Sequence, residues 1–267
     1  MPVITLITDW HQDDHYTGAV KGKLISLMPE VRLVEISHQI PSFDYFKAAF
    51  ILRNSYRAYP AGTVHIVGVN SEASPNIPHV AVQHNGHYFI GADNGILGIV
   101  FNGKAEKVVC LEHSTETSFP EFDVFVDAAA YLAGGGEIER LGSILPSLFL
   151  PIAFRPTIEE NQIQGGILYV DSFSNVITNI SKELFEEERH GRAFDIYVNS
   201  NHYVISKINT FYHETSPGEL LALFNSAGLL EIAIYRGNAA ELLNLGSSAV
   251  IRVKFYNSSK REVLTLS

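Results

Sequence analysis

The fold of the first half is decided by one stretch, Val3-Ile4-Thr5-Leu6-Ile7 followed by Thr8-Asp9-Trp10-His11. A short apolar run rich in β-branched residues that ends in polar residues is typical of a buried parallel strand. In open α/β sheets, ligands bind beyond the C-terminal ends of such strands. Asp9 and the polar residues after it are therefore candidates for a functional site.

Strands and helices alternate after this stretch. The pattern predicts strand, helix, strand, helix and strand over 3–7, 16–28, 31–36, 46–59 and 63–69. This order predicts parallel strands joined by helical crossovers. Asn85-Gly86, between two short apolar runs, predicts a hairpin, and Asp93-Asn94-Gly95 predicts a tight turn. We expect residues 1–150 to form an α/β domain with a mainly parallel sheet flanked by helices.

The second half has a different character. Pro146, Pro151 and Pro156 punctuate the stretch from Gly142 to Pro156, and we expect a linker over 151–165. Residues 166–267 predict a small all-β barrel, because short apolar runs separated by turns recur there. The expected strands are 167–170, 194–198, 202–205, 220–224, 229–234 and 249–255.

Composition narrows the class of partner. The chain has 267 residues, 46% of them hydrophobic, and a formal net charge of −10. This charge argues against nucleic acid as the partner, and no apolar run approaches the ~18 residues of a membrane span. The chain begins with a strand and has no leader-like segment, so we expect a cytoplasmic protein. The single cysteine, Cys110, excludes an internal disulfide.

A cluster of possible metal ligands follows the first strand, formed by Asp9, His11, Asp13, Asp14 and His15. Carboxylates and imidazoles could serve a metal-dependent hydrolase. However, position 12 is Gln, so the His-Glu-x-x-His pattern is absent. Asp13 and Asp14 also suit the cap of the following helix. We expect no metal and keep the hydrolase as an alternative.

Several polar segments match a known family in order along the chain. The chain resembles the S-adenosyl-L-methionine (SAM) hydroxide adenosyltransferase family, relatives of the bacterial fluorinase and chlorinase. The matching segments are Thr8-Asp9-Trp10-His11, Glu35-Ile36-Ser37-His38, Tyr59-Pro60-Ala61-Gly62-Thr63-Val64, Ala92-Asp93-Asn94-Gly95-Ile96-Leu97, Asp171-Ser172-Phe173-Ser174-Asn175-Val176-Ile177-Thr178-Asn179-Ile180 and Asn225-Ser226-Ala227-Gly228-Leu229-Leu230-Glu231-Ile232-Ala233.

This resemblance implies a reaction and an assembly. Water or hydroxide would attack the ribose C5′ of SAM and displace methionine, leaving adenosine. The expected assembly is a homotrimer with the nucleoside ligand at the subunit interface. The implied ligand contacts are Asp9 with the ribose diol, Phe43 on the ribose, Phe119 beside C5′, Asp171 with the methionine ammonium, Ser226 with its carboxylate, Phe173 and Asn175 with the adenine, and the backbone of Asn238-Ala239 with the adenine amino group.

The chain departs from the family where water is activated. In the family, an Asp, an Arg and a His are the set associated with activation of the water. The corresponding residues here are Asn70, Ile77 and Pro120. An amide cannot act as a carboxylate base, and proline offers no donor. The candidates for catalysis are therefore Asn70 itself, Glu121 and His11, with Glu121 the best candidate base. Two alternatives stay open: Glu121 is a solvated loop acid, or the protein binds SAM or adenosine without turnover.

Overall fold

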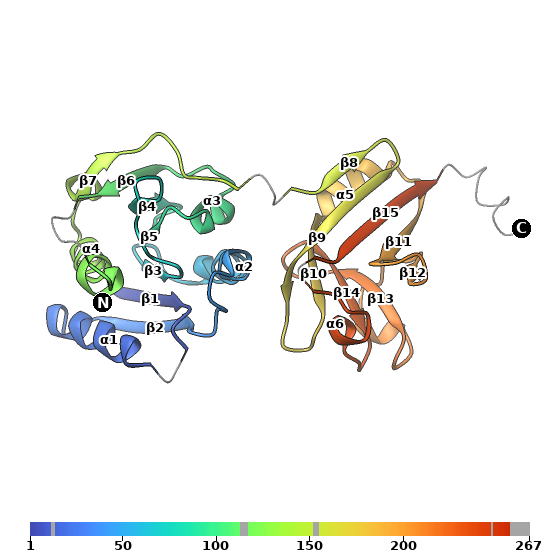
Figure 1. Ribbon diagram of the computed structural model, residues 1–267, viewed down its shortest axis with the longest axis horizontal. Helices are drawn as coiled ribbons and strands as arrows, with labels where there is room; N and C mark the ends of the chain where they lie inside the picture. The colour runs from blue at the N-terminus through green and yellow to red at the C-terminus, as the bar shows by residue number, and fades with distance from the viewer. Residues whose placement is uncertain (12–13, 113–116, 152–154, 247, 257–267) are drawn as a thin grey trace, which may run out of the picture. The chain divides into compact units, whose positions relative to one another are not determined.

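The chain folds into two compact units. The computed structural model describes residues 1–11, 14–112, 117–151, 155–246 and 248–256 (Figure 1). The first unit is Met1–Pro151 and the second is Ile152–Ser267. No helix in the described part of the chain is long and apolar enough to cross a membrane.

A seven-stranded mixed sheet forms the centre of the first unit. The order is β2-β1-β3-β5-β4-β6-β7. The pairs among β2, β1, β3 and β5 are parallel, and those beyond β5 are antiparallel. The bounds are β1 Val3–Thr8, β2 Arg32–Ser37, β3 Val64–Gly68, β4 His79–His84, β5 His87–Ala92, β6 Lys107–Leu111 and β7 Gly142–Ile144. The parallel half leaves the C-terminal ends of β1 and β3 side by side, which positions the site.

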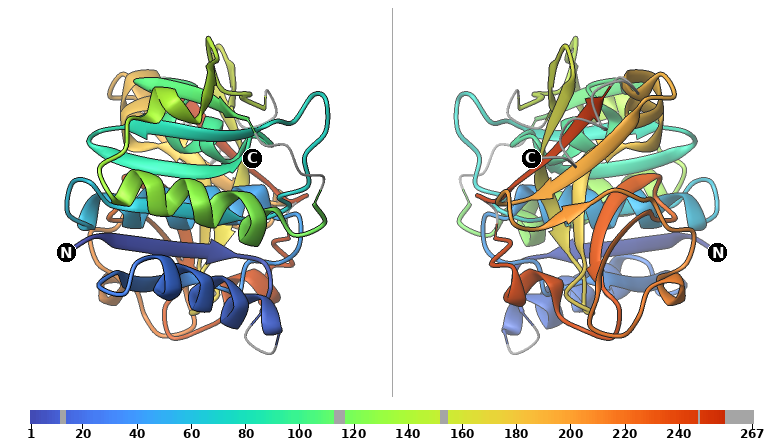
Figure 2. Two further views of the ribbon diagram at one scale, coloured as in Figure 1. Left: turned by 90° about the vertical axis from the view of Figure 1, so that its left-hand side faces the viewer. Right: turned by 90° about the vertical axis from the view of Figure 1, so that its right-hand side faces the viewer.

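Helices cover both faces of this sheet. One face carries α1 and α4, which lie side by side in front of the strands in the left view of Figure 2; the other carries α2 and α3. The bounds are α1 His15–Leu27, α2 Tyr45–Ser55, α3 Ile96–Phe101 and α4 Val126–Ala133. The apolar core under α4 joins Ile4, Leu6 and Ile66 of the strands to Phe125 and Ala129. Burial of this apolar surface holds the sheet and its covering helices together.

The second unit is a nearly closed antiparallel barrel. The strand order is β12-β11-β15-β9-β10-β14-β13, with β8 paired to β9, and Asn209, just after β12, bridges to Leu223 of β13. Phe185 of α5 fills the barrel and packs edge-on against Phe194, with ring centroids 5.1 Å apart. The bounds are β8 Thr157–Glu159, β9 Gln162–Val170, β10 Val176–Ser181, α5 Lys182–Arg189, β11 Ala193–Val198, β12 Val204–Ile205, β13 Leu220–Phe224, β14 Leu229–Ile234, α6 Ala239–Leu242 and β15 Val250–Tyr256.

The predicted fold class is confirmed, and some local predictions need correction. Gly142–Ile144 is an edge strand paired with β6, although it opens the proline-containing stretch. Part of the expected linker 151–165 is strand, because Thr157–Glu159 pairs with the start of β9. The Asp93-Asn94-Gly95 turn leads directly into α3, an unpredicted helix, with Gly95 in the left-handed region at φ 107°. The predicted hairpin is present, with Asn85 and Gly86 at φ 50° and 74°.

Candidate functional site

The site begins where β1 and β3 end together. The backbone N–H of Asp9 donates to the Gly68 carbonyl at 3.3 Å, and the Asn70 N–H donates to Asp9 Oδ2 at 3.2 Å. Burial raises the pKa of the Asp9 carboxyl, and the Asn70 N–H lowers it by a smaller amount. Asp9 is therefore fixed at the sheet edge with one oxygen engaged by the backbone.

The loop after β3 is held in an unusual backbone conformation. Asn70 has φ 46°, a left-handed conformation that asparagine tolerates better than most residues. Its side-chain amide donates to the Tyr45 hydroxyl at 2.6 Å. The buried Asn94 amide donates to the carbonyls of Val69 and Asn70, at 2.9 and 3.1 Å. Asn70 thus contributes its backbone to Asp9, while its side chain is occupied by Tyr45.

Glu121 lies over the end of β3. It begins η2, a π-helical turn over Glu121–Phe125 that leads into α4, and it is only 5% exposed. A Cβ added to Gly68 would lie 3.0 Å from Glu121 Cγ and 3.1 Å from Thr8 Cγ2. Glycine at this position therefore leaves the space that the Glu121 side chain occupies. The alternative of a solvated loop acid is wrong, because this contact between distant segments buries the carboxylate.

The Glu121 carboxylate has little to compensate its charge. Among the described residues, no lysine, arginine or histidine forms an ion pair with it. Burial raises its pKa, and the negative charge of Asp9 raises it further. The Ser71 hydroxyl, the backbone N–H of Glu121 itself and the Trp10 indole each lower the pKa by less than burial raises it. A carboxyl with a raised pKa is a suitable general base or acid near neutral pH.

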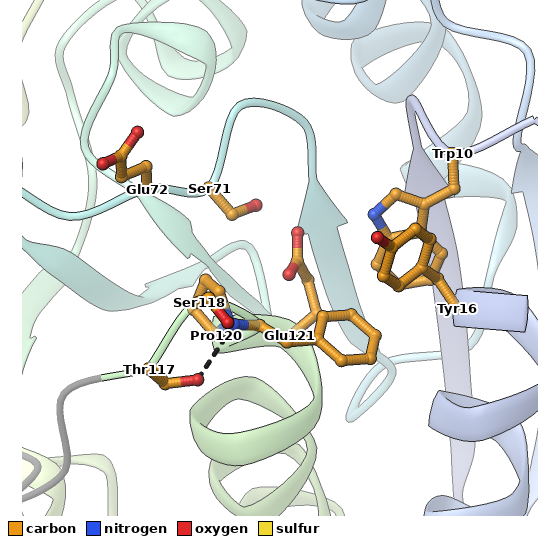
Figure 3. Close-up of a pocket in the computed structure, with 9 residues that line it drawn as sticks. Trp10, Tyr16, Ser71, Glu72, Thr117, Ser118, Pro120 and Glu121 are labelled. Carbon is orange, nitrogen blue, oxygen red and sulfur yellow. Dashed lines mark hydrogen bonds between the residues drawn. The ribbon is translucent and has the colours of Figure 1, made fainter.

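A pocket of about 740 Å³ opens in front of Glu121. Figure 3 shows the Glu121 carboxylate pointing into the space between Ser71 and the rings of Trp10 and Tyr16. Phe119 packs edge-on against Tyr16 and Trp10, with centroids 4.9 and 5.7 Å apart. The lining residues are Trp10, Tyr16, Ser71, Glu72, Thr117, Ser118, Phe119, Pro120 and Glu121. In the described part of the chain this lining contains two carboxylates and three aromatic rings, and no basic side chain.

The buried His38 packs against Trp10. The His38 ring stacks on Trp10 with an interplanar angle of 9° and centroids 6.3 Å apart. His38 Nδ1 and Thr8 Oγ1 are hydrogen-bonded at 2.7 Å, and burial lowers the pKa of His38. A neutral imidazole thereby fixes the wall of the pocket that Trp10 forms.

Other predicted residues near β1 lie outside this lining. His11 is exposed, its backbone N–H donates to the His38 carbonyl at 2.9 Å, and its charge lowers the pKa of Asp9. Phe43 is 66% exposed. Asp14 is the N-cap of α1 but makes no side-chain capping bond. Asp13, a proposed metal ligand, lies outside the described residues, and within those described no group of three or more ligands is placed to hold a metal.

A second pocket, of about 560 Å³, lies in the second unit. Asp171 organises it through a tight turn: Oδ1 accepts the N–H groups of Phe173 and Asn175 at 2.9 and 2.8 Å, and Oδ2 accepts Asn175 Nδ2 at 3.2 Å. Ser174 completes the turn at φ 60°, and the Phe173 ring is left 77% exposed. The lining residues are Asp171, Phe173, Asn175, Tyr212, Ile234, Tyr235, Arg236 and Gly237.

A buried carboxylate supports this second pocket. Glu231 is 3% exposed and accepts hydrogen bonds from the Tyr212 hydroxyl at 2.6 Å and from Asn225 Nδ2 at 3.2 Å. Burial raises the pKa of Glu231, and the nearby Asp171 charge adds to this effect. Asn225 Oδ1 also accepts the N–H groups of Ala227 and Leu229, at 3.0 and 3.2 Å. Glu231 thus orients Tyr212 and the turn that carries the exposed Ser226.

The structure brings the predicted site residues into two groups. Asp9, Asn70, Phe119 and Glu121 gather at the edge of the first sheet; Asp171, Phe173 and Asn175 line the second pocket. Asn238 and Ala239 follow the lining residue Gly237; Asn238 caps α6 and Ala239 is buried. The sequence analysis did not single out Trp10, Tyr16, Ser71, Tyr212, Tyr235 and Arg236 as site residues. Trp10 and Tyr16 could have been noticed from their sequence positions, because Trp10 lies between Asp9 and His11 and Tyr16 directly follows His15.

Comparisons with known proteins identify relatives along nearly the whole chain. Models of the SAM hydroxide adenosyltransferase N-terminal and C-terminal domains match residues 4–142 and 165–252. An (R)-S-adenosyl-L-methionine hydrolase of Methanocaldococcus jannaschii is 22% identical over 265 residues, covering 92% of this chain and 93% of the relative. The Thermus thermophilus enzyme of the same name is 27% identical, covering 95% and 100%. A fluorinase of Nocardia brasiliensis also matches.

The fold has a close counterpart among solved structures. The crystal structure of an uncharacterized conserved protein from Thermotoga maritima superimposes with a TM-score of 0.83. The two chains are 26% identical, and the match covers 94% of this chain and 99% of the other.

Proposed function

Since the chain belongs to the SAM hydroxide adenosyltransferase family, we propose that it hydrolyses SAM to adenosine and methionine. The relatives are named as hydrolases of the (R) form of SAM, and we extend that substrate to this protein. The observation that carries the proposal is the position of Glu121. A buried carboxylate with a raised pKa lies beside Asp9, in the pocket that also contains Phe119.

The proposed reaction is a displacement at the ribose C5′. A lone pair of the water oxygen forms the new C5′–O bond while the C5′–S bond breaks. The electron pair of the broken C5′–S bond stays on sulfur. Glu121 takes the proton that water loses, so the products are neutral adenosine and methionine. Because the positive charge on sulfur makes methionine a good leaving group, the protein mainly aligns the reactants, excludes bulk solvent and supplies a base. Asn70 positions Asp9 through its backbone and takes no proton.

The proposed ligand contacts use both pockets. Asp9 accepts hydrogen bonds from the ribose hydroxyls, and a charged acceptor makes these contacts strong. Phe43 packs on the ribose and Phe119 borders C5′. The remaining contacts are Asp171 with the methionine ammonium, Ser226 with its carboxylate, Phe173 and Asn175 with the adenine, and the backbone of Asn238-Ala239 with the adenine amino group.

We also propose a homotrimer with the ligand at the subunit interface. The large exposed side chains of Phe43 and Phe173, 66% and 77% exposed, support this proposal, because a ligand and a neighbouring subunit would cover them. Light scattering of the purified protein tests it, and a monomeric mass would contradict it.

The function is tested by incubating the purified protein with SAM in ¹⁸O-labelled water. We expect adenosine and methionine in equal amounts, with one ¹⁸O in the adenosine 5′-hydroxyl. The mechanism contains no metal step, so EDTA should leave the rate unchanged. SAM binding without products would instead support a non-catalytic binder. Unlabelled adenosine would contradict attack by water at C5′.

A further inference from the structure

The Glu121 carboxylate in the first pocket has no basic partner among the described residues. Glu121 is only 5% exposed. Its carboxylate faces the pocket, as Figure 3 shows, and has no cationic partner in the described part of the chain. The Asp9 carboxylate, whose charge raises the pKa of Glu121, has the same sign and is also partly buried. Burying an ionised carboxylate is costly unless a positive charge or several donors compensate it.

The pocket has the composition of a cation site. The aromatic residues Trp10, Tyr16 and Phe119 line this pocket, and Figure 3 shows the Trp10 and Tyr16 rings across from the Glu121 carboxylate. Aromatic faces attract onium groups, and sites for quaternary ammonium ligands combine several rings in this way. Glu72 adds a further carboxylate at the exposed rim, and none of the lining residues that the structure describes is basic.

From this geometry we infer that Glu121 and the aromatic rings make the pocket selective for ligands with a positive charge at the sulfur position. The inference rests on the proposed function, because it places the C5′ end of the SAM skeleton in this pocket. In a displacement the sulfur lies on the far side of C5′ from the attacking water, so the sulfonium offsets the Glu121 charge across the reacting carbon, whereas the neutral thioether S-adenosyl-L-homocysteine offers no positive charge there. The protein therefore discriminates its substrate from the thioether by charge as well as by shape.

The test uses two ligands that cannot be cleaved by this displacement. Sinefungin carries an ammonium group at the position of the methylsulfonium, and S-adenosyl-L-homocysteine is neutral there. Calorimetry of the wild-type protein should show sinefungin binding roughly 10- to 1000-fold more tightly, the range expected for one charge pair in a partly buried site. Glu121→Gln should bring the two affinities to within about threefold, mainly by weakening sinefungin binding.

Glu30→Gln is the control, because it removes the same charge from an exposed position that lines neither pocket. The affinity ratio should change by less than about threefold, since exposed charges are screened by water and salt. Thermal melting establishes that each variant is folded. Equal affinities in the wild-type protein would overturn the inference, as would a ratio that Glu121→Gln leaves unchanged.

The same samples separate this inference from the proposed function. Adenosine release from SAM together with equal affinities for the two probes would overturn charge selection and leave the hydrolase intact. A large affinity ratio with no adenosine would support charge selection and contradict the hydrolase.

Discussion

The central carboxylates of the two pockets differ in burial and in hydrogen-bond partners. Asp171, in the second unit, accepts three hydrogen bonds from its own turn, two of them from backbone N–H groups. Glu121, in the first unit, is more deeply buried, and no described residue forms an ion pair with it. Both side chains line a cavity, and burial raises the pKa of Glu121.

This difference suits the two carboxylates to different tasks, ligand positioning and proton transfer. A carboxylate that accepts several hydrogen bonds from its own turn is a rigid acceptor, which suits ligand positioning. A buried carboxylate with few partners gains most from a proton or a cation, which suits proton transfer.

Asp9→Ala should abolish detectable binding of sinefungin and SAM. The substitution removes the proposed ribose acceptor and leaves the Asn70 N–H, which now donates to Asp9 Oδ2, without its partner. Calorimetry measures the loss, and a thermal melt shows whether the variant is folded. A folded variant with unchanged affinity would contradict the placement of the ribose beside Asp9.

Gly68→Ala should lower the kcat for adenosine formation by about 10- to 100-fold, because small displacements of a catalytic group are costly. The added Cβ would lie 3.0 Å from Glu121 Cγ, so the Glu121 side chain must move. The control is Gly18→Ala in α1, where an added Cβ meets nothing within 4 Å. A kcat equal to that of the control would show that the position of Glu121 over β3 is unimportant.

Asp171→Ala should destabilise the protein by about 1–3 kcal/mol, since typical hydrogen bonds contribute about 1 kcal/mol each. The variant loses the acceptor that organises the turn to Asn175. Urea denaturation followed by circular dichroism measures the change. Ser172→Ala, at an exposed position in the same turn, is the control, and equal stability of the two variants would contradict the organising role of Asp171.

Glu121→Gln should raise the Tm by a few degrees at neutral pH. The folded-state pKa of Glu121 is raised, so the folded protein holds this proton more tightly than the unfolded chain does. Stability of the wild-type protein therefore falls as pH rises from about 4.5, the ordinary glutamate value, through the folded-state pKa, and then levels off.

The stabilising effect of Glu121→Gln should consequently shrink at about pH 4, where the wild-type carboxyl is protonated in both states. Scanning calorimetry at the two pH values tests the sign. A Tm difference that grows on acidification would contradict a raised pKa at Glu121.

Features with local sequence signals could be predicted. The family resemblance was confirmed, as were the strand that ends at Asp9 and the hairpin at Asn85-Gly86. In the second unit, strand β10 was missed because Thr178 and Asn179 make Val176–Ser181 resemble a polar turn. Helix α5 was missed as well, although the Ser181 side chain caps its first turn.

The environment of Glu121 could not be read from the sequence around it. The neighbouring residues Ser118 and Asp123 suggest an exposed loop, and the π-helical turn has no clear local signal. Glu121 is buried because Gly68, more than fifty residues earlier, leaves room for it at the end of β3. Nonlocal packing of this kind decides the pKa of the group, and with it the chemistry that the group can perform.

The most direct test of the central claim compares adenosine formation at saturating SAM by the wild-type protein and by Glu121→Gln. We expect the variant to stay folded, to bind S-adenosyl-L-homocysteine still, and to lose about 10²- to 10⁴-fold in kcat, the usual contribution of a general base. A variant that releases adenosine at the wild-type rate would contradict the assignment of Glu121 as the base.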